Sequence, residues 1–351
     1  MTALLEIEDL RILLRSGNGE VALVDGVSLA VAPGSVVGLA GESGSGKTLT
    51  GLSAMGFLPD RSRATGAVRF AGQDVLKMST SRLRRMRGHQ VAVVFQDPMT
   101  SLHPMLTVGR QLTEHVEVHL GLSAAQARER AIELLRSVRL PDPEHVLSSY
   151  PHQFSGGMRQ RIAIASALAC GPQLLIADEP TTALDVTVQA GILRLIDRLR
   201  RDNDMAVLLI SHDLGVMSSV ADTLHVLYAG RVVESGPVGE LLSAPRHPYT
   251  RSLLDSLPDP TERGAELRVI RGEPPPPDRR PPGCAFAPRC AFAEPRCIEA
   301  VPPLLAIATG RAAACVVDPF VGSPAAGPPP AHAAADHSSS GASPLAVEDG
   351  S

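Results

Sequence analysis

The sequence lacks long apolar runs. Its most apolar segments, AVLLI and VAVVF, have the length of single strands and not the ~18–20 residues that a membrane-spanning helix needs. The first residues, MTALLEIEDLR, include acidic side chains and no basic segment followed by an apolar one, the pattern of a secretion signal. We therefore expect a protein of the cytoplasm.

The chain also lacks an excess of basic charge, an internal repeat and, before its last quarter, all but one of its cysteines. A formal net charge of −4 argues against a nucleic-acid binder that relies on a basic surface. With no repeat visible, 351 residues predict about two domains with a single copy of the main core, not a tandem pair. Because thiols stay reduced in the cytoplasm, four clustered cysteines indicate metal binding rather than disulfides.

Short apolar strands alternate with helical segments before about residue 242. Strands are predicted at Val21–Val24, Val27–Ala32, Val36–Ala40, 68–70 and 91–95, in LLIAD (174–178) and in AVLLIS (206–211). Helices are predicted from Lys47, between Thr107 and Leu140 with Ser123 as an N-cap, in MRQRIAIASALAC (158–170) and at 186–201. The alternation predicts an α/β fold with a mostly parallel sheet and a helical insert at about 100–170.

Beyond residue 242 the composition changes. EPPPPDRRPPG (273–283) excludes a helix or a central strand, since proline lacks an amide hydrogen and fixes φ, and it predicts an extended linker. Residues 321–351 have too few large apolar side chains to offset the entropy of ordering, so we expect them to be disordered. The predicted organisation is an α/β domain at 1–242, an extension with the cysteines at 243–320, and a tail at 321–351.

GESGSGKT (41–48) fits the pattern of a phosphate-binding loop. The loop residues are Gly41, Glu42, Ser43, Gly44, Ser45, Gly46, Lys47 and Thr48. Glycines allow consecutive amides to turn inward, and the following helix N-terminus adds positive potential. Lys47 would reach the β- and γ-phosphates of ATP, and the Thr48 hydroxyl would bind Mg²⁺. A glycine-rich turn arising by chance is the alternative, which the preceding strand and following helix disfavour.

Two carboxylates follow the apolar strand in LLIADEP (174–180). Asp178 is placed to bind Mg²⁺, and Glu179 to orient and deprotonate an attacking water. An isolated acidic pair of this kind is more often a solvated turn, but the phosphate loop upstream favours the catalytic interpretation. Gln96 in VFQDP and His212 in LISHDL also follow apolar strands, where their side chains could meet a γ-phosphate. A lone histidine there would otherwise be interpreted as a core residue.

FSGGMRQR (154–161) predicts a second anion site. Ser155, Gly156 and Gly157 precede a long helix, whose N-terminus favours negative charge. Since the chain has one nucleotide loop, the second site would serve the nucleotide of another subunit. Taken alone, the segment could equally be a simple N-cap.

In this order the motifs resemble the ATP-binding subunit of ABC transporters, over about residues 4–258. The resemblance implies a head-to-tail dimer in which Lys47, Thr48, Gln96, Asp178, Glu179 and His212 act in cis. Ser155, Gly156 and Gly157 would act in trans, Asp185 in TALD would connect the two sites, and Gln96 would join Thr48 and Asp178 at Mg²⁺. The region after Gln96 would grip a permease helix. A soluble ABC ATPase of translation or DNA repair is the rival interpretation, although such proteins usually have two cores or a coiled-coil insertion.

FQDPMTSLHP, TTALDVTVQ and HPYTRSLLDSLP (247–258) resemble more narrowly the oligopeptide, dipeptide and nickel importer branch. That resemblance implies a peripheral subunit at the cytoplasmic face of the membrane, a second ATPase subunit in a heterodimer, two permease subunits and an extracytoplasmic solute-binding protein. The expected solutes are peptides, with nickel or another small solute as the alternative. One departure is the lack of any aromatic residue before Phe57. The family usually stacks adenine on one, so Leu13 or Leu14 predicts weaker and less selective packing of the base.

Cys284, Cys290, Cys297 and Cys315 form the cysteine cluster. Thiolates suit zinc or an iron–sulfur cluster, but the spacing matches neither zinc ribbons nor the common ferredoxins. Chemistry alone therefore leaves a four-thiolate metal site and free or oxidisable thiols both open. Some importer ATPases of the same branch have a similar GC-x-F-x-P-R-C pattern, and this resemblance implies a [4Fe–4S] cluster, whose binding would supply folding energy to a proline-rich segment.

Overall fold

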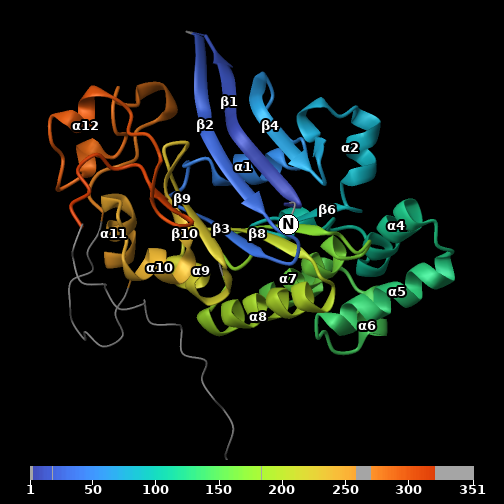
Figure 1. The fold of residues 1–351 in the computed structure, drawn as a ribbon. Helices are drawn as coiled ribbons and strands as arrows, with labels where there is room; N and C mark the ends of the chain where they lie inside the picture. Colours follow the sequence, from blue (N-terminus) through green and yellow to red (C-terminus); the bar gives the residue numbers. More distant parts are fainter. Residues whose placement is uncertain (1–2, 18, 183, 258–269, 321–351) are drawn as a thin grey trace, which may run out of the picture.

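The structure is a computed structural model that describes residues 3–17, 19–182, 184–257 and 270–320, so the predicted tail lies outside the described residues. Its strands form two sheets (Figure 1). The strands are β1 (Leu5–Ser16), β2 (Gly19–Val31), β3 (Val36–Ala40), β4 (Ser62–Phe70), β5 (Gln73–Asp74), β6 (Val91–Val94), β7 (Leu174–Asp178), β8 (Ala206–Ser211), β9 (Thr223–Tyr228), β10 (Arg231–Pro237), β11 (Leu305–Ala308) and β12 (Arg311–Ala313).

The smaller sheet is antiparallel, with the strand order β2-β1-β4-β5. The segments predicted as two strands, Val21–Val24 and Val27–Ala32, are the single strand β2, and its partner β1 was not predicted. The prediction divided β2 at Gly26 because glycine is typical of turns. Gly26 is the extra residue of a bulge between the pairs Leu10–Val27 and Arg11–Asp25, and its φ of 78° lies in the region that favours glycine.

The larger sheet has the order β11-β12-β10-β9-β3-β8-β7-β6. Its central strands from β9 to β6 are parallel, as the alternation of strands and helices predicts, and β10, β12 and β11 are antiparallel. Alternate residues of β8 face opposite sides of the larger sheet. Leu208 therefore contributes to the core between the two sheets, and Leu209 to the core between the larger sheet and the helices.

The helices are α1 (Lys47–Ser53), α2 (Thr80–Met86), α3 (Pro98–Ser101), α4 (Val108–Leu120), α5 (Ala124–Ser137), α6 (Pro143–Ser148), α7 (Gly156–Ala167), α8 (Val186–Asp202), α9 (Leu214–Val220), α10 (Val238–Ser243), α11 (Pro248–Asp255) and α12 (Arg296–Glu299), with 3₁₀ turns η1 (Val75–Lys77), η2 (Pro151–Gln153), η3 (Pro277–Arg279) and η4 (Ala287–Arg289). The helical stretch predicted at 107–140 is two helices, because Gly121 ends α4 with a φ of 66°. Ser123 caps α5 in a capping box, which confirms that prediction.

Of the helical insert, which runs from α3 to α7, the helices α4, α5 and α6 lie on the opposite side of the molecule from α11 and α12 of the C-terminal extension, which is described at 243–257 and 270–320 (Figure 1). The extension adds β12 and β11 to the larger sheet through the pairing of Ala313 with Glu234 on β10. Residues 273–283 contain one 3₁₀ turn and no helix or strand. They pack against β2, where Arg280 Nη2 donates to the carbonyl oxygen of Leu23 at 3.4 Å.

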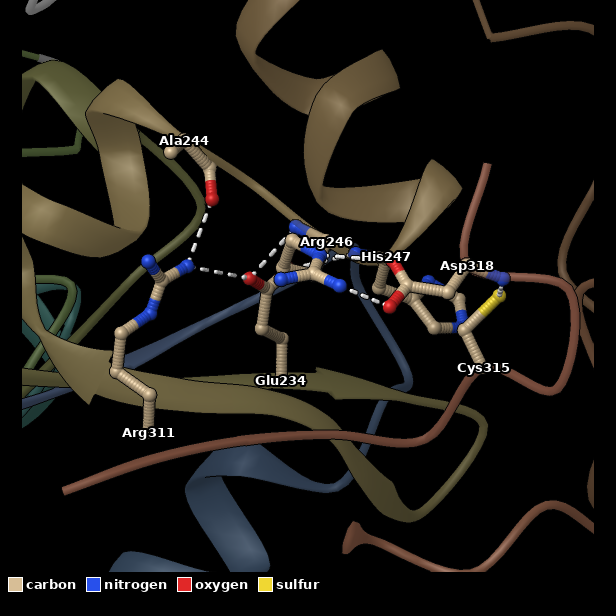
Figure 2. Close-up of polar contacts among 7 residues, drawn as sticks. All are labelled: Glu234, Ala244, Arg246, His247, Arg311, Cys315 and Asp318. Carbon is tan, nitrogen blue, oxygen red and sulfur yellow. Dashed lines mark hydrogen bonds and ion pairs between the residues drawn. The ribbon is translucent and has the colours of Figure 1, made fainter. Parts of the chain in front are cut away.

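A buried carboxylate joins the extension to β10 (Figure 2). Glu234 has no exposed surface, and its carboxylate accepts hydrogen bonds from the amides of Arg246 and His247 at 2.8 and 2.9 Å. Burial raises the pKa of Glu234, while these two amides oppose the shift. The Arg246 guanidinium also pairs with Asp318, whose amide donates to Cys315 Sγ at 3.3 Å. The same network thus connects the core sheet to the last cysteine of the cluster.

Candidate active site

The phosphate loop, residues 41–48, connects β3 to α1, so the predicted strand–loop–helix context is confirmed. Gly41, Gly44 and Gly46 have φ values of 143°, 75° and 98°, which L-residues with a side chain rarely adopt. A Cβ atom on Gly41 would also lie only 2.1 Å from the carbonyl oxygen of Leu227. The loop can take this path only because glycine occupies these positions.

Lys47 is buried at the base of the loop. Its Nζ donates to the carbonyl oxygens of Gly41 and Glu42 at 2.7 and 2.9 Å. Burial lowers the pKa of Lys47, and the nearby carboxylates of Glu179, Asp178 and Glu42 counteract that shift. The ammonium group is therefore held within the loop, close to the two carboxylates predicted for catalysis.

Thr48 and Asp178 meet directly, although they come from different elements. Thr48 Oγ1, in the first turn of α1, donates to Asp178 Oδ1 at the end of β7 at 3.0 Å. Asp178 is 7% exposed, and burial raises its pKa. The two oxygen-bearing side chains predicted to bind Mg²⁺ therefore lie together.

Glu179 and His212 form a second contact at the same edge of the sheet. His212 Nδ1 lies 3.2 Å from Glu179 Oε1, and Thr182 Oγ1 donates to Glu179 Oε2 at 2.9 Å. Glu179 has a φ of 46°, unusual for a residue with a side chain, and strain of this kind often accompanies functional positions. The carboxylate is thus fixed on both oxygens.

Gln96 and the residues predicted to act in trans lie apart from these contacts. Gln96 is exposed two residues beyond β6, which pairs in parallel with β7 and so ends at the same edge as Asp178. Ser155 is the N-cap of α7, its Oγ accepting from the amide of Met158 at 3.4 Å. A Cβ atom on Gly156 would lie 3.5 Å from Leu184 Cδ2, and one on Gly157 would lie 2.9 Å from Val188 Cγ1. Asp185, the residue predicted to connect the two sites, is the N-cap of α8 and is exposed.

The four cysteines of the cluster line one small cavity together with Phe286, Phe292 and His247. None forms a disulfide. Backbone amides of Phe292, Glu294 and Asp318 donate to the sulfurs of Cys290, Cys297 and Cys315 at 3.4, 3.5 and 3.3 Å. Burial raises the pKa of Cys284, Cys290 and Cys315. In the described ranges, no group of three or more His, Cys, Asp or Glu side chains is arranged to hold a single metal ion, so the predicted metal site receives no support from such an arrangement.

Sequence reasoning missed two residues that contact the phosphate loop, Tyr249 and Arg289. The Tyr249 hydroxyl accepts a hydrogen bond from the amide of Glu42 at 2.8 Å, and Arg289 pairs with the Glu42 carboxylate. Tyr249 lies in HPYTRSLLDSLP (247–258), and Arg289 in GCAFAPRC (283–290), the segment that matches the GC-x-F-x-P-R-C pattern, so both segments were noted for other reasons. Neither motif contains a local signal for a contact with residue 42, because the contact arises from the packing of the extension on the core.

Comparison with known proteins agrees with this architecture. The model of the ABC transporter family matches residues 24–182, and that of the oligopeptide/dipeptide transporter C-terminal region matches residues 233–297. The dimeric structure of a bacterial ABC transporter cassette superposes with a TM-score of 0.60 at 26% identity, over 67% of this chain and 98% of that one. Another solved structure, of an ATP-binding subunit of an ABC transporter, gives 0.55 at 29% identity, over 68% and 91%.

Sequence relatives extend the match over most of the chain. A Brucella abortus protein whose provisional name is peptide import ATP-binding protein is 50% identical over 313 residues, 89% of this chain and 94% of the relative. The oligopeptide transport ATP-binding protein OppD of Salmonella typhimurium is 45% identical over 312 residues, 89% and 93%. The fold and site define an ATPase of the ABC type. The chain belongs to the family of ABC transporter ATP-binding proteins, in the oligopeptide/dipeptide branch.

Proposed function

We propose that this protein is the ATP-hydrolysing subunit of an ABC importer that takes up oligopeptides or dipeptides. The observation that carries the proposal is the meeting of Thr48 with Asp178 and of Glu179 with His212 beside a glycine-dependent phosphate loop. The match of residues 233–297 to the peptide transporter C-terminal region favours peptides. Nickel import by the same machinery remains the second candidate, since solute choice belongs to other subunits.

In this proposal the phosphate loop binds the β- and γ-phosphates through its amides and through Lys47, which exchanges its carbonyl partners for phosphate oxygens. Thr48, Asp178 and Gln96 are the residues that would hold Mg²⁺, which neutralises phosphate charge when it is bound. Glu179 orients the attacking water and accepts its proton, as the new oxygen–phosphorus bond forms and the bond to ADP breaks. His212 holds the Glu179 carboxylate in place.

The second half of each ATP site would come from a partner subunit. Ser155, Gly156 and Gly157 lie at the start of a 12-residue helix, α7, where the amides and the helix dipole favour an anion. Asp185 caps the next helix, α8, whose Val188 lies against Gly157, so it is suited to connect the two sites. This supports a head-to-tail dimer, and we propose a second, related ATPase subunit as the partner.

A hollowed surface next to the helical insert would receive the permease subunits. It is lined by Gln73, Met78, Arg82, Arg85, Met86, His89, Gln90, Val118 and His119. Val118 in this surface is 73% exposed, and Met105 in the helical insert is 77% exposed, an apolar exposure that suits a protein interface. In the described ranges, no helix has the length and apolar character needed to cross a membrane. We propose a peripheral position at the cytoplasmic face of the membrane, with an extracytoplasmic binding protein delivering the solute.

We further propose that Cys284, Cys290, Cys297 and Cys315 hold a [4Fe–4S] cluster. Such a cluster has each thiolate on a different iron, so its ligands stand farther apart than the ligands of a single ion. The four cysteines line one cavity, as the four thiolate ligands of such a cluster would. Three of the sulfurs also accept hydrogen bonds from backbone amides, which suits thiolates that bind a metal cluster. The cluster would supply folding energy to a segment with little core of its own.

The test of the main proposal is uptake by the assembled transporter. The protein would be purified with its permease subunits, reconstituted in vesicles and supplied with binding protein and labelled peptides. Peptide-dependent ATP hydrolysis and uptake, both lost in Glu179→Gln, are expected. Hydrolysis without any associated permease, or uptake of Ni²⁺ and not of peptides, would contradict peptide import.

A further inference from the structure

The C-terminal extension contacts Glu42 of the phosphate loop through both the side chain and the backbone of this residue. Arg289 Nη1 and Nη2 donate to Glu42 Oε2 and Oε1 at 2.6 and 2.9 Å. The Glu42 amide donates to the hydroxyl of Tyr249 on α11 at 2.8 Å. The carboxylate of this loop residue is therefore directed at the extension.

Arg289 is set in place by contacts that use two more of its N–H donors. Its Nη1 also donates to the Tyr228 hydroxyl at 3.1 Å, and its Nε to the carbonyl oxygen of Arg271 at 2.9 Å. Only 5% of the Arg289 side chain is exposed, against 25% for that of Glu42. A planar guanidinium held on several sides pairs with a carboxylate in one orientation, which distinguishes this ion pair from a mobile surface pair.

An aromatic cluster supports this arrangement. The ring centroids of Tyr228 and Tyr249 are 4.6 Å apart, and each lies 5.3 Å from that of Phe286 in the extension. Two of the three tyrosines of the chain are thus used at this contact. Farther along the extension, the Glu234 and Asp318 network of Figure 2 attaches it to β10, so Arg289 is carried by a segment that is anchored at both ends.

The contact reaches the lysine of the loop. Lys47 Nζ donates to the carbonyl oxygen of Glu42, the residue that Arg289 and Tyr249 hold. Charge matters as much as shape, because an unpaired carboxylate in a loop that binds a triphosphate would repel it. Pairing with Arg289 removes that repulsion at the point where the loop leaves β3.

We propose that Arg289 is a positioning residue of the ATP site, which neutralises Glu42 and keeps its side chain turned toward the extension. The proposal rests on the proposed ATP site at residues 41–48. It makes nucleotide affinity depend on a residue that lies 247 positions away in sequence, between two cysteines of the cluster. A merely structural ion pair would affect stability and leave nucleotide binding to the folded protein unchanged.

The test is the equilibrium binding of a fluorescent ATP analogue to the purified full chain, with thermal unfolding measured on the same samples. Arg289→Gln is expected to weaken binding about tenfold, and Arg289→Lys less, because lysine restores the charge but not the paired hydrogen bonds. The double variant Glu42→Gln/Arg289→Gln is expected to recover most of the loss, since it removes the unpaired charge. Raising the salt concentration should shrink the defect of Arg289→Gln.

Arg296→Gln is the matched control, because Arg296 pairs with Glu294 in the same extension but is 53% exposed, and no change in binding is expected. Lys47→Ala tests the underlying site. If Lys47→Ala abolishes binding while Arg289→Gln binds as the wild type does, the role of Arg289 is overturned and the ATP site stands. If Lys47→Ala binds normally, the ATP site itself is wrong. A double variant as weak as Arg289→Gln would overturn the neutralisation of Glu42, even if Arg289→Gln is less stable.

Discussion

Thr48 and Asp178 are 130 residues apart in the sequence and are joined by a hydrogen bond of 3.0 Å. The contact exists because β3 and β7 both pair with β8 in parallel, which brings the residues after each strand to the same edge of the sheet. Two oxygen side chains that arrive there from separate motifs create the position for Mg²⁺ in the proposed site.

Asp178→Asn should therefore separate nucleotide binding from hydrolysis. The amide can still accept from Thr48 but supplies no charge to a metal ion, so ATP hydrolysis by the assembled transporter should fall by about a hundredfold or more. Binding of an ATP analogue without Mg²⁺ should change little. Asp278→Asn, an exposed position in the proline-rich segment, is the control. Wild-type hydrolysis in Asp178→Asn would exclude Asp178 from the metal site.

His212→Ala tests whether the histidine acts through Glu179. The imidazole lies 3.2 Å from the Glu179 carboxylate and is more than half exposed, so its loss should leave the fold intact. We expect hydrolysis to fall by about 10²–10³-fold in kcat with little change in the KM for ATP, because orientation of the attacking water is what is lost. A variant that raises KM and leaves kcat unchanged would assign His212 to nucleotide binding instead.

These two pairs indicate how far the sequence could predict the site. GESGSGKT, LLIADEP and LISHDL each combine a strand end with reactive residues, and parallel pairing necessarily gathers strand ends, so Thr48, Asp178, Glu179 and His212 could be placed together in advance. The contact of Arg289 with Glu42 could not. It depends on how the extension packs on the core. The two charged residues are 247 positions apart, and no periodicity or motif spacing in the sequence relates them.

The fold was predicted in the same uneven way. Buried strands such as LLIAD and AVLLIS were evident as short apolar runs, and Ser123 was evident as a cap. The β1–β2 hairpin was missed because the bulge at Gly26 interrupts the alternation of β2. The strands β11 and β12 were missed because LAIA and RAA are too short to predict, and their place beside β10 is decided by tertiary packing.

The base selectivity of the site can be tested at β1. Leu13 and Leu14 are half-buried neighbours whose side chains point to opposite faces of the strand, so only one of them can reach a nucleotide base. Leu13→Tyr or Leu14→Tyr, whichever faces the base, should tighten ATP binding about tenfold through stacking. Measured dissociation constants for ATP and GTP decide this, with the exposed Leu305→Tyr as control. A strong preference for ATP in the wild type would contradict the weak packing expected here.

The cysteine cluster predicts a metal content that depends on four thiols and not on the fifth. After anaerobic purification, Cys290→Ser and Cys284→Ser should lose most of the iron and acid-labile sulfide found in the wild type, since a ligand is missing. Cys170→Ser should not, because Cys170 is buried three residues beyond the end of α7, away from the cluster in sequence, with its Sγ 3.5 Å from the carbonyl oxygen of His115. Iron at the same level in all variants, or none in the wild type, would exclude an iron–sulfur cluster here.

His247 predicts a loss of stability in acid. Its side chain is 1% exposed beside Phe286, its Nδ1 accepts from the amide of Tyr249 at 3.1 Å, and burial lowers the pKa of His247 to about 3. In the unfolded chain the ring would titrate near pH 6.5, so between these values only the unfolded state binds the proton. The stabilising contribution is therefore complete above pH 6.5 and is lost progressively as the pH falls toward 3.

His247→Asn keeps a side-chain acceptor for the Tyr249 amide and removes the titrating ring. Urea unfolding between pH 7 and pH 5 should cost the wild type about 2 kcal/mol more than this variant, from about 1.4 kcal/mol per pH unit for one proton. His225, whose pKa is lowered to about 4 by desolvation, titrates in both proteins and cancels in the difference. At pH 7 and pH 8 the two proteins should show the same small dependence on pH. Equal losses between pH 7 and pH 5 would mean that His247 is not the proton acceptor that destabilises the fold.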